Sequence, residues 1–194
     1  LPFSVLGPMG RTVDDAYLLL QAQMGVDPHD PFSTAPDVDL FAPLEAADLG
    51  SIRAMITPDL GGAPMSNSYR SIFAKRVEIF SRYFASAENG KPDFTDVDNC
   101  FEVLRGVNFV AAHGERVRLH RDKLSPNVVD NVDRGLNYSL EDVAIAHIQQ
   151  SQIARNWLDL FNDIDVVICP AAAKTPFDHS QWSVNEIDLS LIHI

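Results

Sequence analysis

The chain has 194 residues, of which 46% are hydrophobic and 22% charged, so it is neither a disordered nor a collagen-like protein. Its formal net charge of −12 has the wrong sign for a protein that neutralises phosphates, and nucleic acid is not expected as a partner. The apolar runs are far shorter than the roughly 20 residues that a membrane span needs, so no membrane is expected. Two cysteines cannot build a disulfide framework, and we expect a cytoplasmic protein.

A helix is predicted over residues 12–24. Thr12 is placed to cap it, and Asp15 stands three residues later as the reciprocal partner. Apolar residues cover a wide arc of this segment, which predicts a largely buried helix. Gly25 ends the helix, and the many prolines and aspartates of residues 26–50 predict a surface loop with short turns.

A short apolar run over residues 52–57 predicts a buried strand, because Pro58 and the glycines of PDLGGAP close it. Helices are predicted over residues 66–84 and 96–122, and a third runs from its cap at Ser139 to about residue 162. Two of these helices carry an apolar face that is predicted to point into the core. The faces comprise Tyr69, Ile72, Phe73, Val77, Phe80, Tyr83 and Phe84, and then Val143, His147, Ile148, Ala154, Trp157, Leu158 and Phe161.

A second strand is predicted over residues 165–169. Its VVIC run is rich in β-branched residues, as expected of a strand that is covered on both faces. A strand, long helices and another strand in this order predict an α/β fold, in which the two strands are parallel and joined by a crossover.

No motif in the sequence assigns a reaction by itself. His113 and His120 are seven residues apart without a third ligand, so no metal site is predicted, and no cofactor is implied. The chain has no GxSxG elbow for a nucleophile and no GxGxxG or GxxxxGK loop for phosphates. The residues alone therefore predict an acidic α/β protein of unassigned chemistry.

Four blocks of the sequence resemble, in the right order, enzymes of the amidase signature family. In the first block, residues 1–25, the matching positions are Gly7, Pro8, Met9, Arg11, Thr12, Val13 and Asp15. The other blocks are GVDPHDPFS at 25–33, DLGSIRAMITPDLGG at 48–62 and DIDVVICPAAAKTPF at 163–177. The resemblance implies a mixed central sheet flanked by helices, as part of the amidase signature fold.

The chemistry that the resemblance implies is hydrolysis of a carboxamide C–N bond by a Ser, cis-Ser, Lys triad. In this family a Gly-Ser-Ser signature and the catalytic lysine precede the block that matches GPMGR, and neither occurs in this sequence. We therefore expect a middle to C-terminal piece of an amidase, with no catalytic residue of its own and no activity alone. Its expected partner is a small-molecule amide, bound by the full-length enzyme.

The loop that follows the second strand is the predicted wall of the substrate pocket. Strand ends in open α/β sheets face the ligand crevice, so Pro170, Ala171, Thr175 and Pro176 are the candidate pocket residues. Gly7, Pro8, Arg11, Thr12 and Asp15 are predicted to be structural, with Arg11 tying the signature loop through a charge-assisted bond.

Several alternatives stay open. The chain could derive from an A-type subunit of glutamyl-tRNA amidotransferase, although its negative charge argues mildly against a tRNA-binding face. It could also be an interaction module that keeps the scaffold without the chemistry. Residues 1–188 are predicted to be one partial domain, and residues 189–194 resemble adapter read-through and need not be native. Neither the amide substrate nor the oligomeric state can be read from the sequence, and a homodimer is one option.

Overall fold

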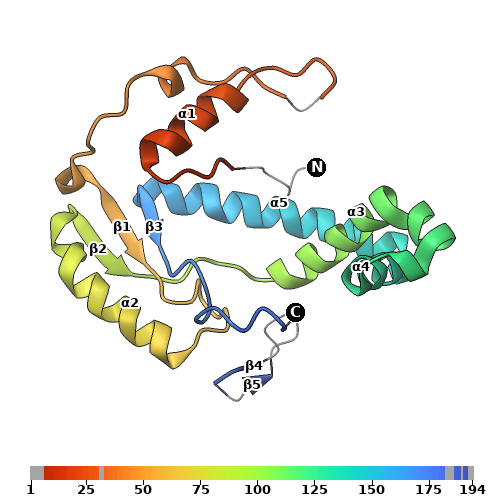
Figure 1. Cartoon of the computed structure of the whole chain (residues 1–194). Helices are drawn as coiled ribbons and strands as arrows, with labels where there is room; N and C mark the ends of the chain where they lie inside the picture. Colours follow the sequence, from red (N-terminus) through yellow and green to blue (C-terminus); the bar gives the residue numbers. More distant parts are fainter. Residues whose placement is uncertain (1–6, 31–32, 182–185, 189, 192–194) are drawn as a thin grey trace. The chain divides into compact units, whose positions relative to one another are not determined.

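The computed structural model describes residues 7–30, 33–181, 186–188 and 190–191. The chain divides into two units, residues 1–47 and residues 48–194, and each is described by itself (Figure 1). No helix in the described part of the chain is long and apolar enough to cross a membrane. Ser190 and Leu191 of the doubtful tail form a short strand, and the rest of residues 189–194 lies outside the described residues.

In its described residues, the first unit contains one α-helix, α1 (Val13–Gln23), and a long loop with a 3-10 turn at Val38–Phe41. The cap is confirmed, because the Thr12 hydroxyl accepts a hydrogen bond from the Asp15 N–H at 3.1 Å. The predicted burial of this helix is wrong, since Val13 is 75% and Leu18 68% exposed. An amphipathic helix buries its apolar face only against a second packed layer, and the described part of this unit supplies no other α-helix or strand.

The second unit is built on a parallel sheet with the strand order β2-β1-β3. The strands are β1 (Arg53–Ile56), β2 (Ser86–Asn89) and β3 (Val166–Ile168), and Ala54 pairs with Ala87 on one side and Val166 on the other. The predicted α/β fold and the parallel pairing of the two expected strands are confirmed. A separate antiparallel pair joins β4 (Glu186–Ile187) and β5 (Ser190–Leu191).

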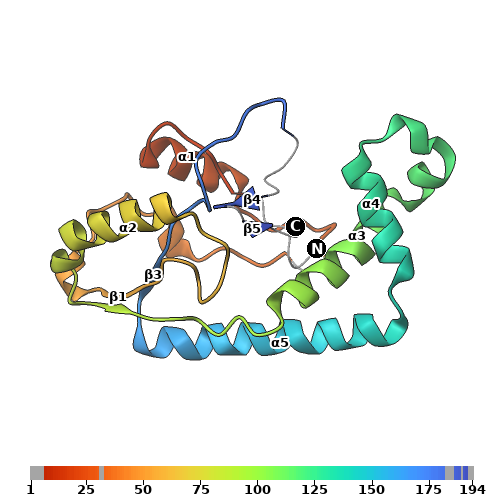
Figure 2. The same cartoon turned by 90° about the horizontal axis from the view of Figure 1, so that it is seen from below.

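The α-helices among the described residues of this unit are α2 (Asn67–Phe80), α3 (Val97–His120), α4 (Pro126–Asn137) and α5 (Leu140–Asp163). The sheet lies between α2 and α5 (Figure 2). Ser139 caps α5 reciprocally with Asp142, and Ser125 caps α4 with Pro126 in its first turn. The three long helices therefore begin and end within a few residues of their predicted bounds.

The core of the second unit has two centres. Ala54, Ile56 and Thr57 are buried in and beside β1, while Cys100, Val103, Leu104 and Ala146 are buried between α3 and α5. The Cys100 thiol donates to the Ala146 carbonyl at 3.3 Å, and burial raises the pKa of this thiol.

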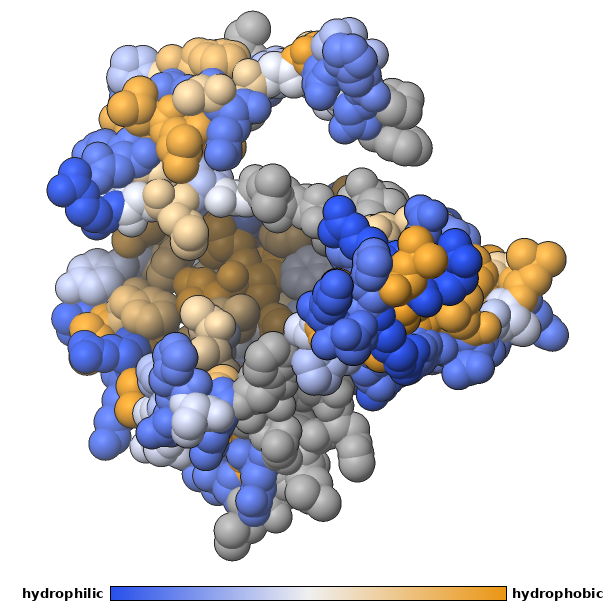
Figure 3. Space-filling view, turned by 45° about the vertical axis from the view of Figure 1, so that its right-hand side comes forward, coloured by the Kyte–Doolittle hydropathy of each residue, from blue (hydrophilic) through white to orange (hydrophobic). Residues whose placement is uncertain are grey.

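Half of the positions predicted to face the core are exposed. Tyr69, Phe73, Val77, Phe80, Phe84, Val143 and Trp157 are half-buried, but the outward positions are Ile72, Tyr83, His147, Ile148, Ala154, Leu158 and Phe161. The physical reason is that the small sheet of the described residues covers only part of each helix face. Its edge strand β3 is likewise half-buried, although its sequence predicts cover on both faces. Apolar side chains also remain on the surface of the helical end, at the right of Figure 3.

An ion pair between Arg53 and Asp165 joins β1 to the residue just before β3. The guanidinium donates from Nη2 to Oδ1 at 2.9 Å and from Nε to Oδ2 at 3.1 Å, and the Arg53 backbone N–H donates to Oδ2 at 2.7 Å. The Asp165 N–H completes the contact by donating to the Arg53 carbonyl at 2.8 Å. Such a forked pair fixes direction as well as distance, so it aligns the two strands in one register.

This pair makes the stability of the fold depend on pH. The hydrogen bonds from Arg53 lower the pKa of Asp165 from 3.8 to about 2. A carboxyl group whose pKa is lower in the folded than in the unfolded chain stabilises the fold above its unfolded value. The contribution is therefore present above pH 3.8 and is lost as the pH falls from 3.8 toward 2.

The substitution Asp165→Asn tests this contribution without a change in side-chain shape. We expect a lower Tm at pH 7 and a smaller further loss of Tm between pH 4 and pH 2 than in the unsubstituted chain, measured by thermal melts. The Arg53–Asp165 pair is partly exposed and is therefore screened by salt, so the difference in Tm between the variant and the unsubstituted chain is larger at low salt. Glu115→Gln is the control, because its pair with Arg118 is longer, at 3.8 Å, and more exposed. Equal melts of the Asp165→Asn and unsubstituted chains at pH 7 would contradict the prediction.

Candidate functional site

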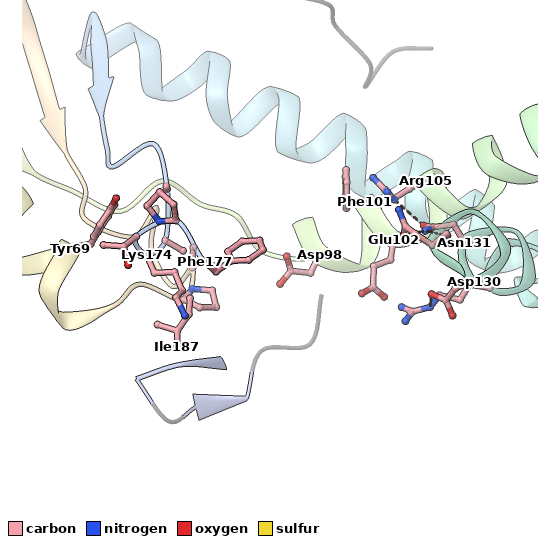
Figure 4. Close-up of a pocket in the computed structure, with 18 of the residues that line it drawn as sticks. Tyr69, Asp98, Phe101, Glu102, Arg105, Asp130, Asn131, Lys174, Phe177 and Ile187 are labelled. Atoms are coloured by element: carbon pink, nitrogen blue, oxygen red, sulfur yellow. Dashed lines mark hydrogen bonds and ion pairs between the residues drawn. The ribbon is translucent and has the colours of Figure 1, made fainter. Parts of the chain in front are cut away.

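A cavity of about 1060 Å³ lies in the second unit, between the sheet end and the helical end (Figure 4). Loops that follow β1 and β3 form one wall, with Tyr69 of α2 and Ile187 of β4. The opposite wall comes from α3 and α4. The described lining comprises Ala63, Pro64, Tyr69, Asp98, Phe101, Glu102, Arg105, Gly106, Asn127, Asp130, Asn131, Arg134, Ala172, Ala173, Lys174, Thr175, Pro176, Phe177 and Ile187.

The two loops of the first wall are held together at the start of α2. Ser66 is buried and caps this helix, its hydroxyl accepting from the Tyr69 N–H at 3.3 Å. The Ser66 backbone N–H donates to the Ala173 carbonyl at 2.8 Å, which ties the loop after β3 to the loop after β1. One polar residue therefore begins the helix and joins both loops of the wall.

The loop after β1 is organised by Asp59. Its carboxylate accepts from the Gly61 N–H at 3.1 Å and pairs with the Arg70 guanidinium at 2.9 Å. The hydrogen bond from Arg70 is the main cause that lowers the pKa of Asp59. Gly61 has a φ of 97°, in the left-handed region that glycine adopts without strain. These contacts hold the turn that presents Ala63 and Pro64 to the cavity.

The opposite wall uses one face of α3. Asp98, Phe101, Glu102 and Arg105 are spaced by three, one and three residues, so they lie on the same side of the helix. In Figure 4, Phe101, Glu102 and Arg105 lie with the α4 residues at one end of the cavity, and Tyr69, Lys174, Phe177 and Ile187 lie at the other. Asp98 stands between the two groups. The cavity is therefore elongated, with one end that is mainly apolar and aromatic apart from Lys174, and a charged end that also holds Phe101.

Charges of both signs line the cavity. Asp130 and Arg134 neutralise each other in an ion pair of 2.9 Å. Arg105 donates from Nε to the Asn131 amide oxygen at 2.9 Å, and Lys174 donates to the Glu186 carbonyl at 3.3 Å. Asp98 and Glu102 add two carboxylates on α3. The site suits a ligand without a large net charge.

The helical wall depends on a close approach of α3 to α4. A Cβ atom added to Gly135 would overlap the Gly106 carbonyl oxygen, and one added to Gly106 would lie 3.0 Å from the Gly135 Cα. Only glycines allow the two backbones to approach so closely, and the approach brings Arg105 of α3 within reach of Asn131 of α4.

The structure separates the predicted pocket residues. Thr175 and Pro176 line the cavity, whereas Pro170 and Ala171 precede the described lining in the same loop. Their roles in substrate binding stay predictions. Gly7, Pro8, Arg11, Thr12 and Asp15 lie in the first unit, where the highly exposed Arg11 pairs with Asp15 at 3.3 Å. The predicted bond from Arg11 to a signature loop stays untested.

The side of the cavity that α3 and α4 form is not predicted from the sequence. Arg105 and Asn131 are 26 residues apart and belong to different helices, so no local motif connects them. One available signal is the mixed polar and aromatic face of α3, since a helix that only packs on a core has an apolar face.

The sequence matches the Amidase family over residues 2–193, and the chain belongs to this family. No curated protein matches the sequence. Solved structures of the amidase signature fold are similar to it. A bacterial aryl acylamidase of the amidase signature enzymes has a TM-score of 0.80 at 17% identity, over 96% of this chain and 42% of its own.

Two further structures support the same fold. An amidase has a TM-score of 0.69 at 16% identity, over 92% of this chain and 37% of its own. The inhibitor-bound form of a vestigial complex, related to the origins of an s-triazine catabolic enzyme, has a TM-score of 0.74 at 17% identity. It is matched over 88% of this chain and 36% of its own. The chain thus spans about two-fifths of the length of these structures, and at these identities the likeness shows the fold.

The cavity offers groups that can bind a small molecule. Its described lining contains no serine, cysteine or histidine, and therefore no nucleophile beside a histidine base. Within the described residues, no three His, Cys, Asp or Glu side chains gather as a metal site. The described lining supplies aromatic surface, the two side-chain amides of Asn127 and Asn131 and several charged groups, which is the composition of a small-molecule pocket.

The substitution Gly135→Ala tests the close approach of the helices. We expect a loss of about 1–3 kcal/mol in the free energy of unfolding, because the methyl group meets backbone that cannot rotate away. Gly114→Ala is the matched control on α3, since its added Cβ meets only a Val110 methyl at 3.7 Å. That variant should be neutral or stabilised by up to about 1 kcal/mol. Denaturant unfolding measures both, and an unchanged stability of Gly135→Ala would contradict the close contact.

Proposed function

We propose that this chain forms the substrate-binding part of an amidase that hydrolyses carboxamide C–N bonds, and that the Ser, cis-Ser, Lys triad lies outside this sequence. The observation that carries the proposal is a cavity between strand-end loops and helices, in a chain of the Amidase family. Its described lining can bind a small molecule but contains no serine nucleophile. In the proposed enzyme the chain holds the amide, and the triad attacks it.

In the proposed reaction, the triad outside this sequence breaks the C–N bond and the cavity of this chain binds the substrate. The nucleophilic serine adds to the amide carbonyl, the C–N bond breaks as the amine takes up a proton, and water then releases the acid. The cavity contributes by holding the amide in one orientation against the serine, which removes translational and rotational freedom before the reaction. The proposal places the enzyme in the cytoplasm, and the free thiols of Cys100 and Cys169 are consistent with a reducing compartment.

An activity assay tests whether catalysis depends on residues outside this sequence. We expect the 194-residue chain to leave primary amides and anilides intact, because it has no triad, while the full-length enzyme hydrolyses members of the same panel. Release of ammonia or aniline measures both. Turnover by the chain alone that persists in independent, highly purified preparations would overturn the proposed location of the triad. A full-length enzyme that is inert on the whole panel would overturn the amidase function.

Thr175 offers a second test of the same proposal. In the full-length enzyme, Thr175→Trp places a large ring in the cavity wall, and we expect KM for bulky anilides to rise about tenfold or more, with small aliphatic amides much less affected. Ser71→Trp is the control, because Ser71 is exposed on α2 and lies outside the described lining. An unchanged substrate profile of Thr175→Trp would remove the loop after β3 from the substrate site.

A further inference from the structure

The charged end of the cavity contains the guanidinium of Arg105, which is held in place through Nε while its other N–H donors remain available within the described residues. We propose that Arg105 determines specificity by binding a neutral acceptor oxygen, such as a ring carboxamide or ketone, on the aryl part of the amide substrate. This inference rests on the proposed function, and it narrows the substrate class to aryl amides with a polar substituent away from the scissile bond.

Hydrogen bonds with asparagines of α4 hold the Arg105 side chain in place. Its Nε donates to the Asn131 amide oxygen at 2.9 Å, and the Asn131 amide nitrogen donates to the Asn127 carbonyl at 2.8 Å. The chain of bonds holds the plane of the guanidinium. In the part of the chain that the structure describes, neither Nη atom of Arg105 has a hydrogen-bond acceptor. Their N–H groups are therefore available to a ligand in the cavity, which Arg105 lines.

Aromatic rings flank the same guanidinium. Its central carbon lies 5.7 Å from the centroid of Phe101 and 4.9 Å from that of Phe109. Both contacts favour the charged group in this position without occupying its N–H donors. Phe101 also lines the cavity and is 49% exposed, so a substrate ring can pack on it. A ring placed there brings a ring substituent toward the Nη atoms of Arg105.

The surrounding charges favour a neutral substituent over a carboxylate. Asp98 and Glu102 lie on the same face of α3 as Arg105 and have no ion pair within the described residues. Asp130 is neutralised by Arg134. Lys174 lies at the other end of the cavity (Figure 4). On the α3 side the carboxylates of Asp98 and Glu102 therefore outnumber the guanidinium of Arg105, and an added negative charge meets repulsion that a carbonyl does not.

Binding of anilide probes to the 194-residue chain, which is expected to leave them intact, tests the proposal separately from catalysis. The probes are acetanilide, its ring carboxamide 4-acetamidobenzamide and its ring carboxylate 4-acetamidobenzoate, and titration calorimetry measures Kd. We expect the carboxamide to bind about tenfold more tightly than acetanilide, because a hydrogen bond to a charged group adds that much affinity. We also expect it to bind more tightly than the carboxylate.

Variants of Arg105 test whether this residue causes the difference in Kd between the carboxamide and acetanilide. Arg105→Met should remove the preference for the carboxamide and leave acetanilide binding within about twofold, and Arg105→Lys should retain only part of it, because lysine lacks the planar fork. Arg118→Met, on an exposed part of the same helix, is the control that keeps the preference. Thermal melts identify a variant that fails to fold, and in that event the Arg105→Lys result decides.

The outcomes separate this inference from the amidase function. Equal Kd values for acetanilide and the carboxamide, or a preference that survives in Arg105→Met, would overturn the role of Arg105 even if the full-length enzyme hydrolyses amides. Tighter binding of the carboxylate would overturn the neutral-acceptor class. In an active full-length enzyme, the role of Arg105 predicts that Arg105→Met raises KM for the carboxamide about tenfold, with kcat little changed. Failure of hydrolysis alone leaves the binding result standing and removes only its link to amides.

Discussion

The forked contact between Arg53 and Asp165 is the constraint on which the rest of the second unit depends. It joins the beginnings of β1 and β3, so it sets which residues of the two strands lie side by side. Parallel strands in register end at the same edge of the sheet, and the loops that follow them emerge together. The Ser66 N–H then reaches the Ala173 carbonyl, and one wall of the cavity is complete. A contact at one end of the strands thus determines the arrangement of loops at the other.

The second wall follows from a different kind of constraint, the absence of side chains at Gly106 and Gly135. Their contact lets α3 and α4 approach closely enough for Arg105 to bond Asn131, and Asp130 and Arg134 pair on the same surface. The cavity therefore combines a wall set by strand register with a wall set by helix packing. Its composition, mainly apolar and aromatic around Phe177 and Ile187 and richer in charge around Arg105, is suited to a ligand that has both kinds of surface.

Local physics makes much of the second unit predictable from the sequence. Ser66 and Ser139 begin two of the predicted helices, and the apolar VVIC run marks β3, whereas α4, which Ser125 caps, is not predicted. β2 is missed because its sequence, SAEN, has no β-branched or aromatic residue, and it is a strand only because β1 offers it a partner. Periodicity identifies α5 as a helix, but it cannot tell that Ile148 and Leu158 are exposed, since exposure depends on what lies opposite.

The candidate site is predictable on one side only. Thr175 and Pro176 follow a recognisable strand, and strand ends are where α/β sheets bind ligands. Arg105 and Asn131 follow from no such rule, because they meet through a helix contact that two glycines permit. The same holds for Arg53 and Asp165, which are 112 residues apart. Contacts of this kind depend on the whole fold and are not encoded in a local pattern.

Amide hydrogen exchange tests most directly whether strand register holds the cavity wall together. Two backbone N–H groups are relevant. That of Thr57, the residue after β1, donates to the carbonyl of Ile168 in β3, and that of Ser66 donates to the carbonyl of Ala173. The account predicts that both exchange slowly in the unsubstituted chain, and that both exchange faster in Asp165→Ala while the Val103 amide inside α3 keeps its rate. Unchanged exchange at Thr57 and Ser66 in a folded Asp165→Ala chain would contradict it.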